Sequence, residues 1–297
     1  MTRRLIDGCD AILADLDGVV YAGPGAISEA PESLERAKSE GVPVMFVTNN
    51  ASRAVETVAE HLSELGVATR GEDVVSSAQA AAQLLSDRLP AGSRVLITGA
   101  QALSDYIAEA GLTPVSSQHD DPVAVVQGFD PEIGWSDLAE AAYTLADASV
   151  LWIATNTDGS IPRERGIAPG NGTLVDAVAR ATGRTPEVAG KPEAPIFRTG
   201  AQRLGAQRPL VIGDRLDTDI LGGNRAGFAT ALVLTGVDTV RTALGAITDE
   251  RPDHLIADLT GLFAPEAEIA VEESDDSSIA RCGAAQATAH DDGLRIS

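Results

Sequence analysis

Positive charge is scarce in this sequence. Lysine occurs only twice among 297 residues, at Lys38 and Lys191, and the arginines do not balance 44 acidic residues, so the formal net charge is −22. Nucleic acids and anionic membranes both require a basic protein surface, so we expect neither as a partner. An anionic small molecule is compatible with this charge only where a metal ion or a local cation reverses the field at its site.

Cysteine, aromatic residues and long apolar runs are scarce as well. Cys9 and Cys282 lie far apart and indicate neither a disulfide framework nor a cysteine metal cluster. No apolar run approaches the roughly 20 residues of a membrane span, and acidic residues interrupt the N-terminal segment, so we expect no signal peptide and a cytoplasmic protein. Because aromatic residues make up only 3% of the chain, its core must consist mainly of Ala, Val, Leu and Ile.

Short apolar runs alternate with amphipathic helical segments. The helical segments end in glycine, a frequent helix stop, and include residues 31–41, 52–66 and 100–111. This alternation predicts an α/β protein with a doubly wound, mainly parallel sheet, in which ligands bind beyond the carboxyl ends of the strands. The apolar runs are residues 11–16, 42–48, 94–98, 123–128, 149–155, 208–214 and 230–236.

Polar residues stand at the ends of three of these runs. Asp15 lies at the end of the first, Thr48 and Asn49 at the end of the second, and Asp214 at the end of the run 208–214. Carboxyl ends of parallel strands meet at one edge of a sheet, so we expect these side chains to face the same crevice. Packing alone gives no reason for three such endings.

The first of these endings, ADLDG, contains two carboxylates one residue apart. Asp15 and Asp17 share one side of an extended chain, and like charges this close disfavour each other's ionised form. One carboxylate can attack phosphorus to form an aspartyl-phosphate, while the other protonates the leaving group and then activates water. Mg²⁺ among them would relieve the repulsion, with Asp214 as a third carboxylate, and Gly18 would let backbone N–H groups approach an anion.

A bound phosphate also needs donors. Thr48 offers a hydroxyl, Asn49 a backbone or amide donor, and Lys191, between Gly190 and Pro192, a compact positive charge. Taken singly, Thr48 would be an ordinary strand residue and Lys191 a solvated surface lysine. Their combination with the paired carboxylates predicts a phosphate site.

The motifs DLDGVVYAG, VTNN, GKP and GDRLDTD, in this order, resemble those of the haloacid dehalogenase (HAD) superfamily of phosphatases, and within it the NagD-like or 4-nitrophenylphosphatase-like branch. The resemblance covers residues 10–262. It implies that Asp15 is the nucleophile and Asp17 the general acid and base. It also implies phosphate-binding residues, which are Thr48, Asn49 and Lys191.

The resemblance implies a metal site too. In this interpretation Mg²⁺ is held by Asp15, by the main-chain carbonyl of Asp17 and by Asp214. Asp219, which closes the GDxxxxD spacing of the family, would support these ligands from behind.

By the same resemblance the chain has a Rossmann-like HAD core, residues 1–80 and 185–262, and an inserted α/β cap domain, residues 81–184. The cap would exclude water and select the leaving group. The acidic segment 263–297 has no counterpart in these motifs, and its composition predicts a disordered tail. The resemblance also implies a homodimer through the cap, for which no residue of the sequence gives evidence.

The loop 156–172 within the cap is rich in Gly and Pro, as functional loops often are. Asn156 and Asp158 are its candidates for substrate contact, although both residue types also favour turns. Since this loop lacks an aromatic residue, it favours a small polyol or acid over a stacked ring such as pyridoxal. The Ala- and Arg-rich composition is similar to that of actinobacterial members, which favours glycerol 3-phosphate, then 2-phosphoglycolate, over pyridoxal phosphate or aryl phosphates.

Two other classes share parts of this pattern. A response-regulator receiver also clusters aspartates, Mg²⁺, a Thr and a Lys, but it keeps its phosphate, needs no insert of about 100 residues, and carries its acceptor on a middle strand. A HAD-like binding protein without catalysis would lack some of the catalytic residues, and here all of them are present. We therefore expect a Mg²⁺-dependent phosphatase that acts on a small phosphorylated metabolite.

Overall fold

The computed structural model describes residues 3–51, 53–163, 165–265, 268–273, 278–282, 285–290 and 293–296. The chain divides into two compact units. Residues 9–260 form the larger unit, and residues 1–8 together with 261–297 form the smaller one. Among the described residues, no helix combines the length and the apolar character needed to cross a membrane.

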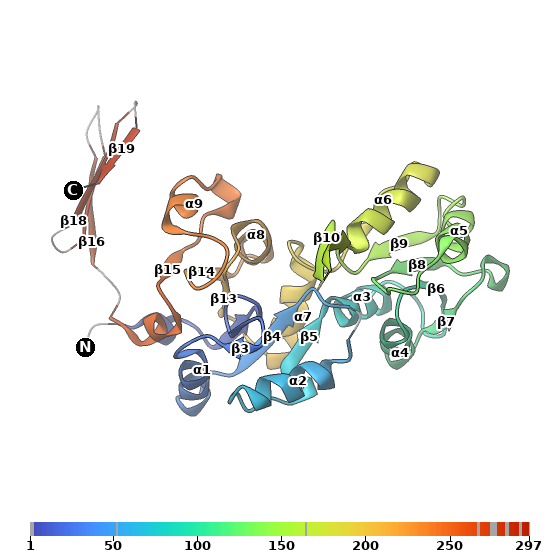
Figure 1. Ribbon diagram of the computed structural model, residues 1–297, viewed down its shortest axis with the longest axis horizontal. Coiled ribbons are helices and arrows are strands. Elements are labelled where there is room, and N and C mark those ends of the chain that lie inside the picture. The colour runs from blue at the N-terminus through green and yellow to red at the C-terminus, as the bar shows by residue number, and fades with distance from the viewer. Residues whose placement is uncertain are drawn as a thin grey trace. The chain divides into compact units, whose positions relative to one another are not determined.

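The larger unit contains a six-stranded sheet, here called the core sheet (Figure 1). Its order is β15-β14-β13-β1-β4-β5, and all neighbouring strands are parallel. This confirms the predicted parallel α/β architecture. The strands are β1 (Ala11–Ala14), β4 (Val44–Thr48), β5 (Val74–Ser76), β13 (Pro209–Gly213), β14 (Ala229–Val233) and β15 (His254–Ile256).

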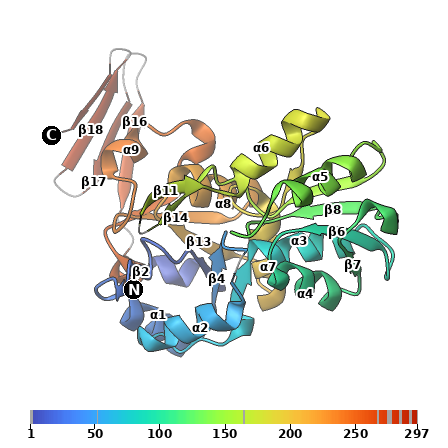
Figure 2. The same ribbon diagram turned by 45° about the vertical axis from the view of Figure 1, so that its right-hand side comes forward.

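A second parallel sheet, here called the second sheet, has the order β12-β9-β8-β6-β7. Figure 2 shows α5 and α6 on one face of this sheet and α3 and α4 on the other. Its strands are β6 (Arg94–Thr98), β7 (Thr113–Val115), β8 (Ala124–Gln127), β9 (Leu151–Ala154) and β12 (Glu187–Val188). The predicted cap boundary at residue 81 therefore falls inside α3, and the boundary at 184 precedes a strand of the second sheet.

Helices join most successive strands in both sheets. In the core sheet, α1 contacts β4, α2 contacts β5, and α7 contacts β1, β4 and β5. The helices are α1 (Ala30–Ser39), α2 (Val55–Glu64), α3 (Ser77–Ser86), α4 (Gln101–Glu109), α5 (Trp135–Thr144), α6 (Asn171–Thr182), α7 (Ala194–Leu204), α8 (Leu221–Ala226) and α9 (Val240–Leu244). Shorter elements are the hairpins β2 (Tyr21–Ala22) with β3 (Gly25–Ala26) and β10 (Ser160–Arg163) with β11 (Gly166–Pro169), and a π-helical turn, Leu216–Ile220.

The two sheets share one apolar cluster through α3. This helix contacts α4 on the side of the second sheet and α7 on the side of the core sheet. Its buried residues are mostly alanines, so that neighbouring helices can approach closely, and Ser76 begins it with a capping box to Gln79. The chain segment between α3 and α7, here called the insert, contains the second sheet. Near the start of this segment Arg88 binds both carboxylate oxygens of Glu187, near its end (Nη1–Oε2 2.5 Å, Nη2–Oε1 2.7 Å). This ion pair joins the places where the chain enters and leaves the insert.

The smaller unit contains an antiparallel sheet in which each strand pairs with the next along the chain. For the described residues of the segment 263–297, this differs from the disorder that composition predicts, and the rest of that segment lies outside the described residues. The small and polar residues conceal local β patterns, such as Ile269 and Val271 on one face of β16. Since β16 is exposed along its whole length, this strand is held more by strand pairing than by burial. The strands are β16 (Ile269–Glu273), β17 (Ser278–Cys282), β18 (Ala285–His290) and β19 (Gly293–Ile296).

Candidate active site

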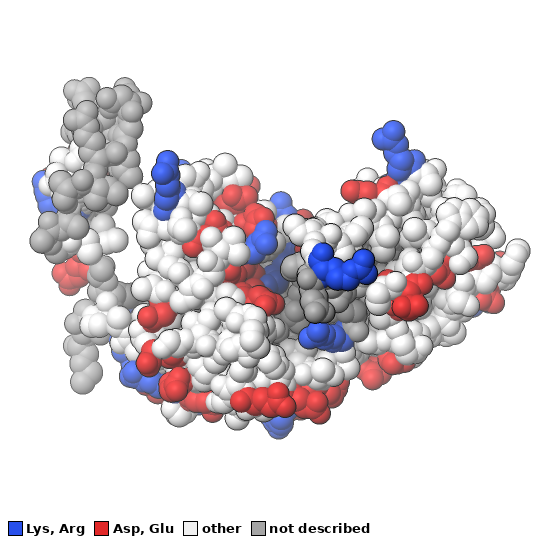
Figure 3. All heavy atoms as spheres, in the orientation of Figure 1, with Lys and Arg blue, Asp and Glu red and all other residues white. Residues whose placement is uncertain are grey.

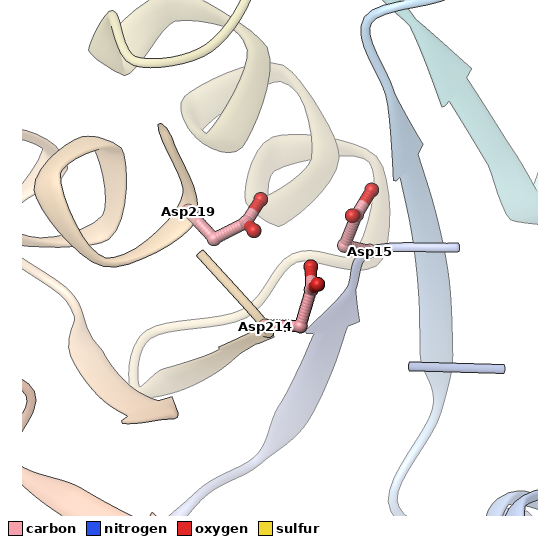
Figure 4. A group of neighbouring side chains, drawn as sticks. All are labelled: Asp15, Asp214 and Asp219. Carbon is pink, nitrogen blue, oxygen red and sulfur yellow. The ribbon is translucent and has the colours of Figure 1, made fainter. Parts of the chain in front are cut away.

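Three carboxylates meet at the carboxyl edge of the core sheet. Asp15 follows β1, Asp214 follows β13, and Asp219 lies on the π-helical turn beyond it. Each offers an oxygen within 4.8 Å of the others, and Figure 4 shows the carboxylates directed toward one another. The N–H of Asp15 donates to the carbonyl of Ile212 (2.9 Å), which joins the two strand ends directly. The structure thus brings Asp15 and Asp214 together at one edge of the sheet.

Lys191 supplies positive charge inside this group. Its Nζ donates to Oδ1 of Asp15 (2.5 Å) and to Oδ1 of Asp219 (2.8 Å). The side chain of Lys191 is only 5% exposed. Burial alone would lower the pKa of Lys191, but the charges of Asp15 and Asp219 outweigh it and raise the pKa. Lys191 therefore stays protonated and compensates the two carboxylates.

The neighbouring carboxyl groups have raised pKa values. Burial, followed by the charge of Asp15, raises the pKa of both Asp214 and Asp17. Burial also raises the pKa of Asp219, against the opposing charge of Lys191. Excess negative charge is therefore concentrated at this edge, where a cation would be stabilised.

Glycines leave the space that these carboxylates occupy. A Cβ on Gly18 would lie 2.3 Å from Oδ2 of Asp214, and one on Gly236 would lie 2.0 Å from the same atom. Gly18 also has a φ of +79°, which side-chain-bearing residues rarely adopt. A Cβ on Gly213 would lie 2.1 Å from Cβ of Asp219. The close approach of the loops around Asp214 and Asp219 therefore depends on the absence of these side chains.

The three carboxylates fit a magnesium site in their chemistry, since Mg²⁺ binds hard oxygen ligands. Oδ2 of Asp214 accepts the N–H of Val237 (2.8 Å), which leaves Oδ1 as its ligand atom. Both oxygens of Asp219 accept hydrogen bonds, one from Lys191 and one from the N–H of Arg215 (3.2 Å). This arrangement favours Asp15 and Asp214 as ligands and Asp219 as their support.

Thr48 and Asn49 lie at the end of β4, on the neighbouring strand. The hydroxyl of Thr48 accepts the N–H of Asn50 (3.1 Å), which leaves its proton for an anion. The Asn49 amide is engaged elsewhere, because its Oδ1 accepts the N–H of Lys191 (2.7 Å) and its Nδ2 donates to the Lys191 carbonyl (3.1 Å). The structure thus connects Asn49 to the lysine, a link between residues 142 positions apart in the sequence.

Asn156 and Asp158 follow β9 and reach the same edge. Nδ2 of Asn49 lies 3.3 and 3.4 Å from the carboxylate oxygens of Asp158, and Nδ2 of Asn156 donates to the Asn49 carbonyl (2.9 Å). Asn156 is buried and Asp158 is exposed. Partial desolvation of the carboxyl group by neighbouring residues raises the pKa of Asp158, although the hydrogen bond from Asn49 opposes this. Of the two, only Asp158 offers a group to an entering molecule.

Sequence reasoning missed several neighbours of this edge. The ring of Tyr21 packs edge-on against that of His61, with ring centroids 5.2 Å apart. Burial, then the charges of Asp17 and Asp15, raises the pKa of Tyr21, which therefore stays neutral. Tyr21 stands within the quoted motif DLDGVVYAG, which could have drawn attention to it, whereas no local signal marks Gly236. Figure 3 shows acidic side chains spread over the visible face of the larger unit, with Lys and Arg side chains between them. Lys191 differs from these surface cations because it is buried.

Comparisons with known proteins agree with the motifs. Two family models, described as haloacid dehalogenase-like hydrolase and HAD-hydrolase-like, match residues 12–113 and 188–262. The chain is 47% identical to D-glycerol 3-phosphate phosphatase of Mycobacterium tuberculosis over 262 residues, 88% of this chain and 73% of the relative. It is 37% identical to acid sugar phosphatase of Staphylococcus aureus over 232 residues, 77% of this chain and 88% of the relative.

Solved structures give the same result. The glycerol phosphate phosphatase of M. tuberculosis in complex with magnesium has a TM-score of 0.83 and 43% identity, covering 93% of this chain and 85% of that chain. The p-nitrophenyl phosphatase of Archaeoglobus fulgidus has a TM-score of 0.77 and 29% identity, covering 86% of this chain and 98% of that chain.

Proposed function

The chain belongs to the haloacid dehalogenase-like hydrolases and is a phosphomonoester hydrolase with Mg²⁺ as its cofactor; from this premise we propose that Asp15 is its nucleophile and glycerol 3-phosphate its substrate. The observation that carries the proposal is the group of Asp15, Asp214 and Asp219, in which the buried Lys191 binds Asp15 and Asp219. The negative charge of a phosphate ester requires a cationic site, and these carboxylates would provide one by holding Mg²⁺ beside Lys191.

In the first step, an oxygen of Asp15 attacks phosphorus, and the bond from phosphorus to the ester oxygen breaks. Asp17 donates its proton to the leaving oxygen, a role for which its raised pKa is suited. In the second step, Asp17 accepts a proton from water as that water attacks the aspartyl-phosphate. Inorganic phosphate then leaves, and Asp15 is a free carboxylate again.

Lys191 screens the charge of Asp15, so that a phosphate dianion can approach a carboxylate nucleophile. The Thr48 hydroxyl can donate to a phosphate oxygen. When bound by Asp15, Asp214 and the main-chain carbonyl of Asp17, Mg²⁺ supplies further positive charge toward the phosphate oxygens. Asn49 contributes through the position of Lys191, since its amide bonds are made to that residue.

The substrate proposal rests on Asp158 and on the relatives. An exposed carboxylate beside the site can accept hydrogen bonds from the hydroxyl groups of a polyol such as glycerol. The same carboxylate would repel the carboxylate of 2-phosphoglycolate, which therefore becomes the second candidate. The named relatives include a glycerol 3-phosphate phosphatase and an acid sugar phosphatase, and both names denote hydroxyl-rich esters.

Three further predictions belong to this proposal. The insert between α3 and α7 acts as a cap over the site, because Asn156 and Asp158 reach the carboxyl edge of the core sheet. Two copies associate through this insert, where α5 exposes Trp135 (78% exposed) and Tyr143 (54%), and the mass in solution tests this. A cytoplasmic location fits the sequence and is tested by fractionation of cells.

The deciding experiment measures phosphate release from glycerol 3-phosphate, 2-phosphoglycolate, a hexose phosphate, pyridoxal phosphate and 4-nitrophenyl phosphate, with Mg²⁺ and with EDTA. We expect release that EDTA abolishes, with glycerol 3-phosphate preferred, and loss of at least about a thousandfold in Asp15→Asn. Asp158→Asn should lower the preference for glycerol 3-phosphate over 2-phosphoglycolate. Retained turnover in Asp15→Asn would refute the nucleophile, and a preference for aryl phosphates would refute the substrate.

A further inference from the structure

Three asparagines link α6 to Lys191 in series, because the side-chain amide of each donates to the main-chain carbonyl of the next residue in the series. Asn171, at the start of α6, donates to the carbonyl of Asn156 (2.7 Å). Asn156 donates to the carbonyl of Asn49 (2.9 Å), and Asn49 binds the main chain of Lys191 on both sides. Lys191 in turn reaches Asp15, so every link between α6 and the proposed nucleophile is a direct contact.

Asn171 has no evident role in its own helix. An asparagine at a helix start usually stabilises it by accepting N–H groups through Oδ1. Here Oδ1 of Asn171 is buried and has no partner among the described residues, while Nδ2 donates away from the helix, to the carbonyls of Gln127 (3.4 Å) and Asn156. The side chain is 1% exposed, and a buried acceptor without a partner costs stability. The two hydrogen bonds donated by Nδ2 are therefore the only polar contacts through which this side chain can stabilise the described structure.

Both polar atoms of the Asn156 side chain make hydrogen bonds, one within the turn after β9 and one to the end of β4 in the core sheet. It is 4% exposed. Its Oδ1 accepts the N–H of Asp158 (3.2 Å), which fixes the turn that carries the exposed carboxylate. Its Nδ2 binds the Asn49 carbonyl, to which the hydroxyl of Ser77 also donates (2.8 Å). The position of Asn49 is thus set from α3 and from the second sheet together.

Asn49 transmits this position to the lysine. A side-chain amide that binds both the N–H and the carbonyl of one residue holds that residue like a neighbouring strand would. The Nζ of Lys191 has to lie between two carboxylates, so a small rotation of its main chain would break one of the two contacts. The lysine is therefore placed by its main chain as much as by its charge.

We propose that Asn156 and Asn171 are positioning residues, which orient Lys191 through Asn49 and so make the phosphate site depend on the seating of the second sheet. The expected effect on turnover rests on the proposed function, whereas the placement of Lys191 by these hydrogen bonds does not depend on it. In this proposal the Asn49 amide is one link in the series of asparagines and does not itself contact the phosphate.

The scarcity of lysine allows a direct test. Protein labelled with ¹⁵N-lysine gives backbone and ammonium signals from Lys38 and Lys191 alone. We expect Asn156→Asp, which keeps an acceptor for the N–H of Asp158 but loses the donor to Asn49, to shift both Lys191 signals. The Lys38 ammonium binds Glu35 and the Ala68 carbonyl, far from this chain of contacts, and should not move.

Asn224→Asp is the matched control. Its Nδ2 also donates to two main-chain carbonyls, of Asp249 (2.8 Å) and Arg251 (3.0 Å), so the same chemical change is made outside the chain of asparagines. We expect it to leave the Lys191 signals in place. Unchanged Lys191 signals in Asn156→Asp, or equal shifts in Asn224→Asp, would overturn the proposal.

Kinetics supply the second readout. In Asn156→Asp we expect kcat to fall by about tenfold for glycerol 3-phosphate and for 4-nitrophenyl phosphate alike, because the lysine serves the phosphate common to both. Asn171→Ala should shift the Lys191 signals in the same direction by a smaller amount. A fall in kcat without movement of the Lys191 signals would overturn the proposal. If the wild type hydrolyses no ester, the proposed function fails, while the lysine signals still decide whether the asparagines position Lys191.

Discussion

The two parallel sheets of the larger unit end in polar residues at their carboxyl edges, but the residues differ in kind. The core sheet ends in Asp15, Thr48 and Asp214, where each carboxylate accepts a hydrogen bond or lies in an ion pair. The second sheet ends in Thr98 and Gln127, whose buried side-chain atoms have no partner among the described residues. The same edge is thus a site of compensated charge in one sheet and of uncompensated dipoles in the other.

This difference shows that strand order alone does not make an active site. Carboxyl ends of parallel strands are where ligands bind in such folds. In the core sheet this edge also receives Lys191 and the turn that carries Asp219, and together they supply both signs of charge. The second sheet contributes to the same region through Asn156 and Asp158, which follow β9, and through Lys191 itself, which follows β12.

Removal of the cation should have the largest effect. In Lys191→Met, the partly exposed carboxylate of Asp15 and the buried carboxylate of Asp219 lose their cation, so we expect turnover to fall by at least about a thousandfold. The free energy of unfolding without Mg²⁺ should fall by about 3 kcal/mol, as when one partner of a buried ion pair is deleted. Urea unfolding with and without Mg²⁺ measures this, and Mg²⁺ should restore part of the loss. Full stability without Mg²⁺ would show that Lys191 is not the compensating charge.

Crowding of Asp214 should have the next largest effect. Gly18→Ala would place a methyl group 2.3 Å from Oδ2 of Asp214 and strain a residue with positive φ. We expect activity to fall by about a hundredfold, with a higher Mg²⁺ concentration needed for half-maximal activity. Gly23→Ala is the control, because φ is also positive there (+60°) and nothing lies within 4 Å of the new Cβ. Equal losses in both variants would indicate backbone strain and not crowding of Asp214.

The second sheet should respond in the opposite way. In Thr98→Val a hydroxyl that is buried and without a partner becomes a methyl group of similar size. We expect the free energy of unfolding to stay the same or to rise by up to about 1 kcal/mol, with kcat unchanged. Urea unfolding and phosphate release measure the two quantities. A loss of more than about 1 kcal/mol would mean that Thr98 has a partner, such as a buried water molecule.

The smallest effect is expected at the amino edge of the core sheet. The carboxylate of Asp10 accepts the N–H groups of Gln207 and Arg208 (2.9 Å each). Burial opposes this, but the two N–H groups prevail and lower the pKa of Asp10. A lowered pKa stabilises the fold above the unfolded value of about 3.9, and this contribution is lost as the pH falls through the folded value.

Asp10→Asn should therefore lower the free energy of unfolding by less than about 1 kcal/mol at pH 7, without changing kcat. Below about pH 4 the difference between the variant and the wild type should shrink, and it should vanish below the folded pKa of Asp10, which urea unfolding across this range measures. A difference that grows toward low pH would contradict the assignment. Asp10 and Asp15 lie at opposite ends of β1, so this variant separates an acid that holds strands together from one proposed to act on substrate.

Sequence reasoning reached the core sheet and the position of its carboxylates because those signals are local. The run before Asp15 and the run before Asp214 are apolar and fully buried as strands, so their ends could be placed to within a residue or two. Edge strands such as β12 (Glu187–Val188) have two or three residues and carry no apolar run that would mark them. The catalytic roles of Asp15, Asp17 and Lys191 stay predictions, since the structure gives their arrangement and not their chemistry.

Contacts between distant residues could not be predicted. The bonds between Asn49 and Lys191 join positions 142 apart, and those between Asn156 and Asn49 join positions 107 apart. Nothing near Asn49 in the sequence distinguishes an amide that binds phosphate from one that binds another main chain. The same limit explains why Asn171, an unremarkable residue after a glycine, was not connected with the site.

The ion pair of Arg88 with Glu187 bears on how the insert could be exchanged between proteins. A segment whose entry and exit are bridged by one bidentate contact leaves and rejoins its host at neighbouring points, as a transplantable module must. Grafting another insert at these two positions would preserve the connectivity of the core sheet. The graft would also have to present an apolar face to α3, whose cluster continues from one sheet into the other.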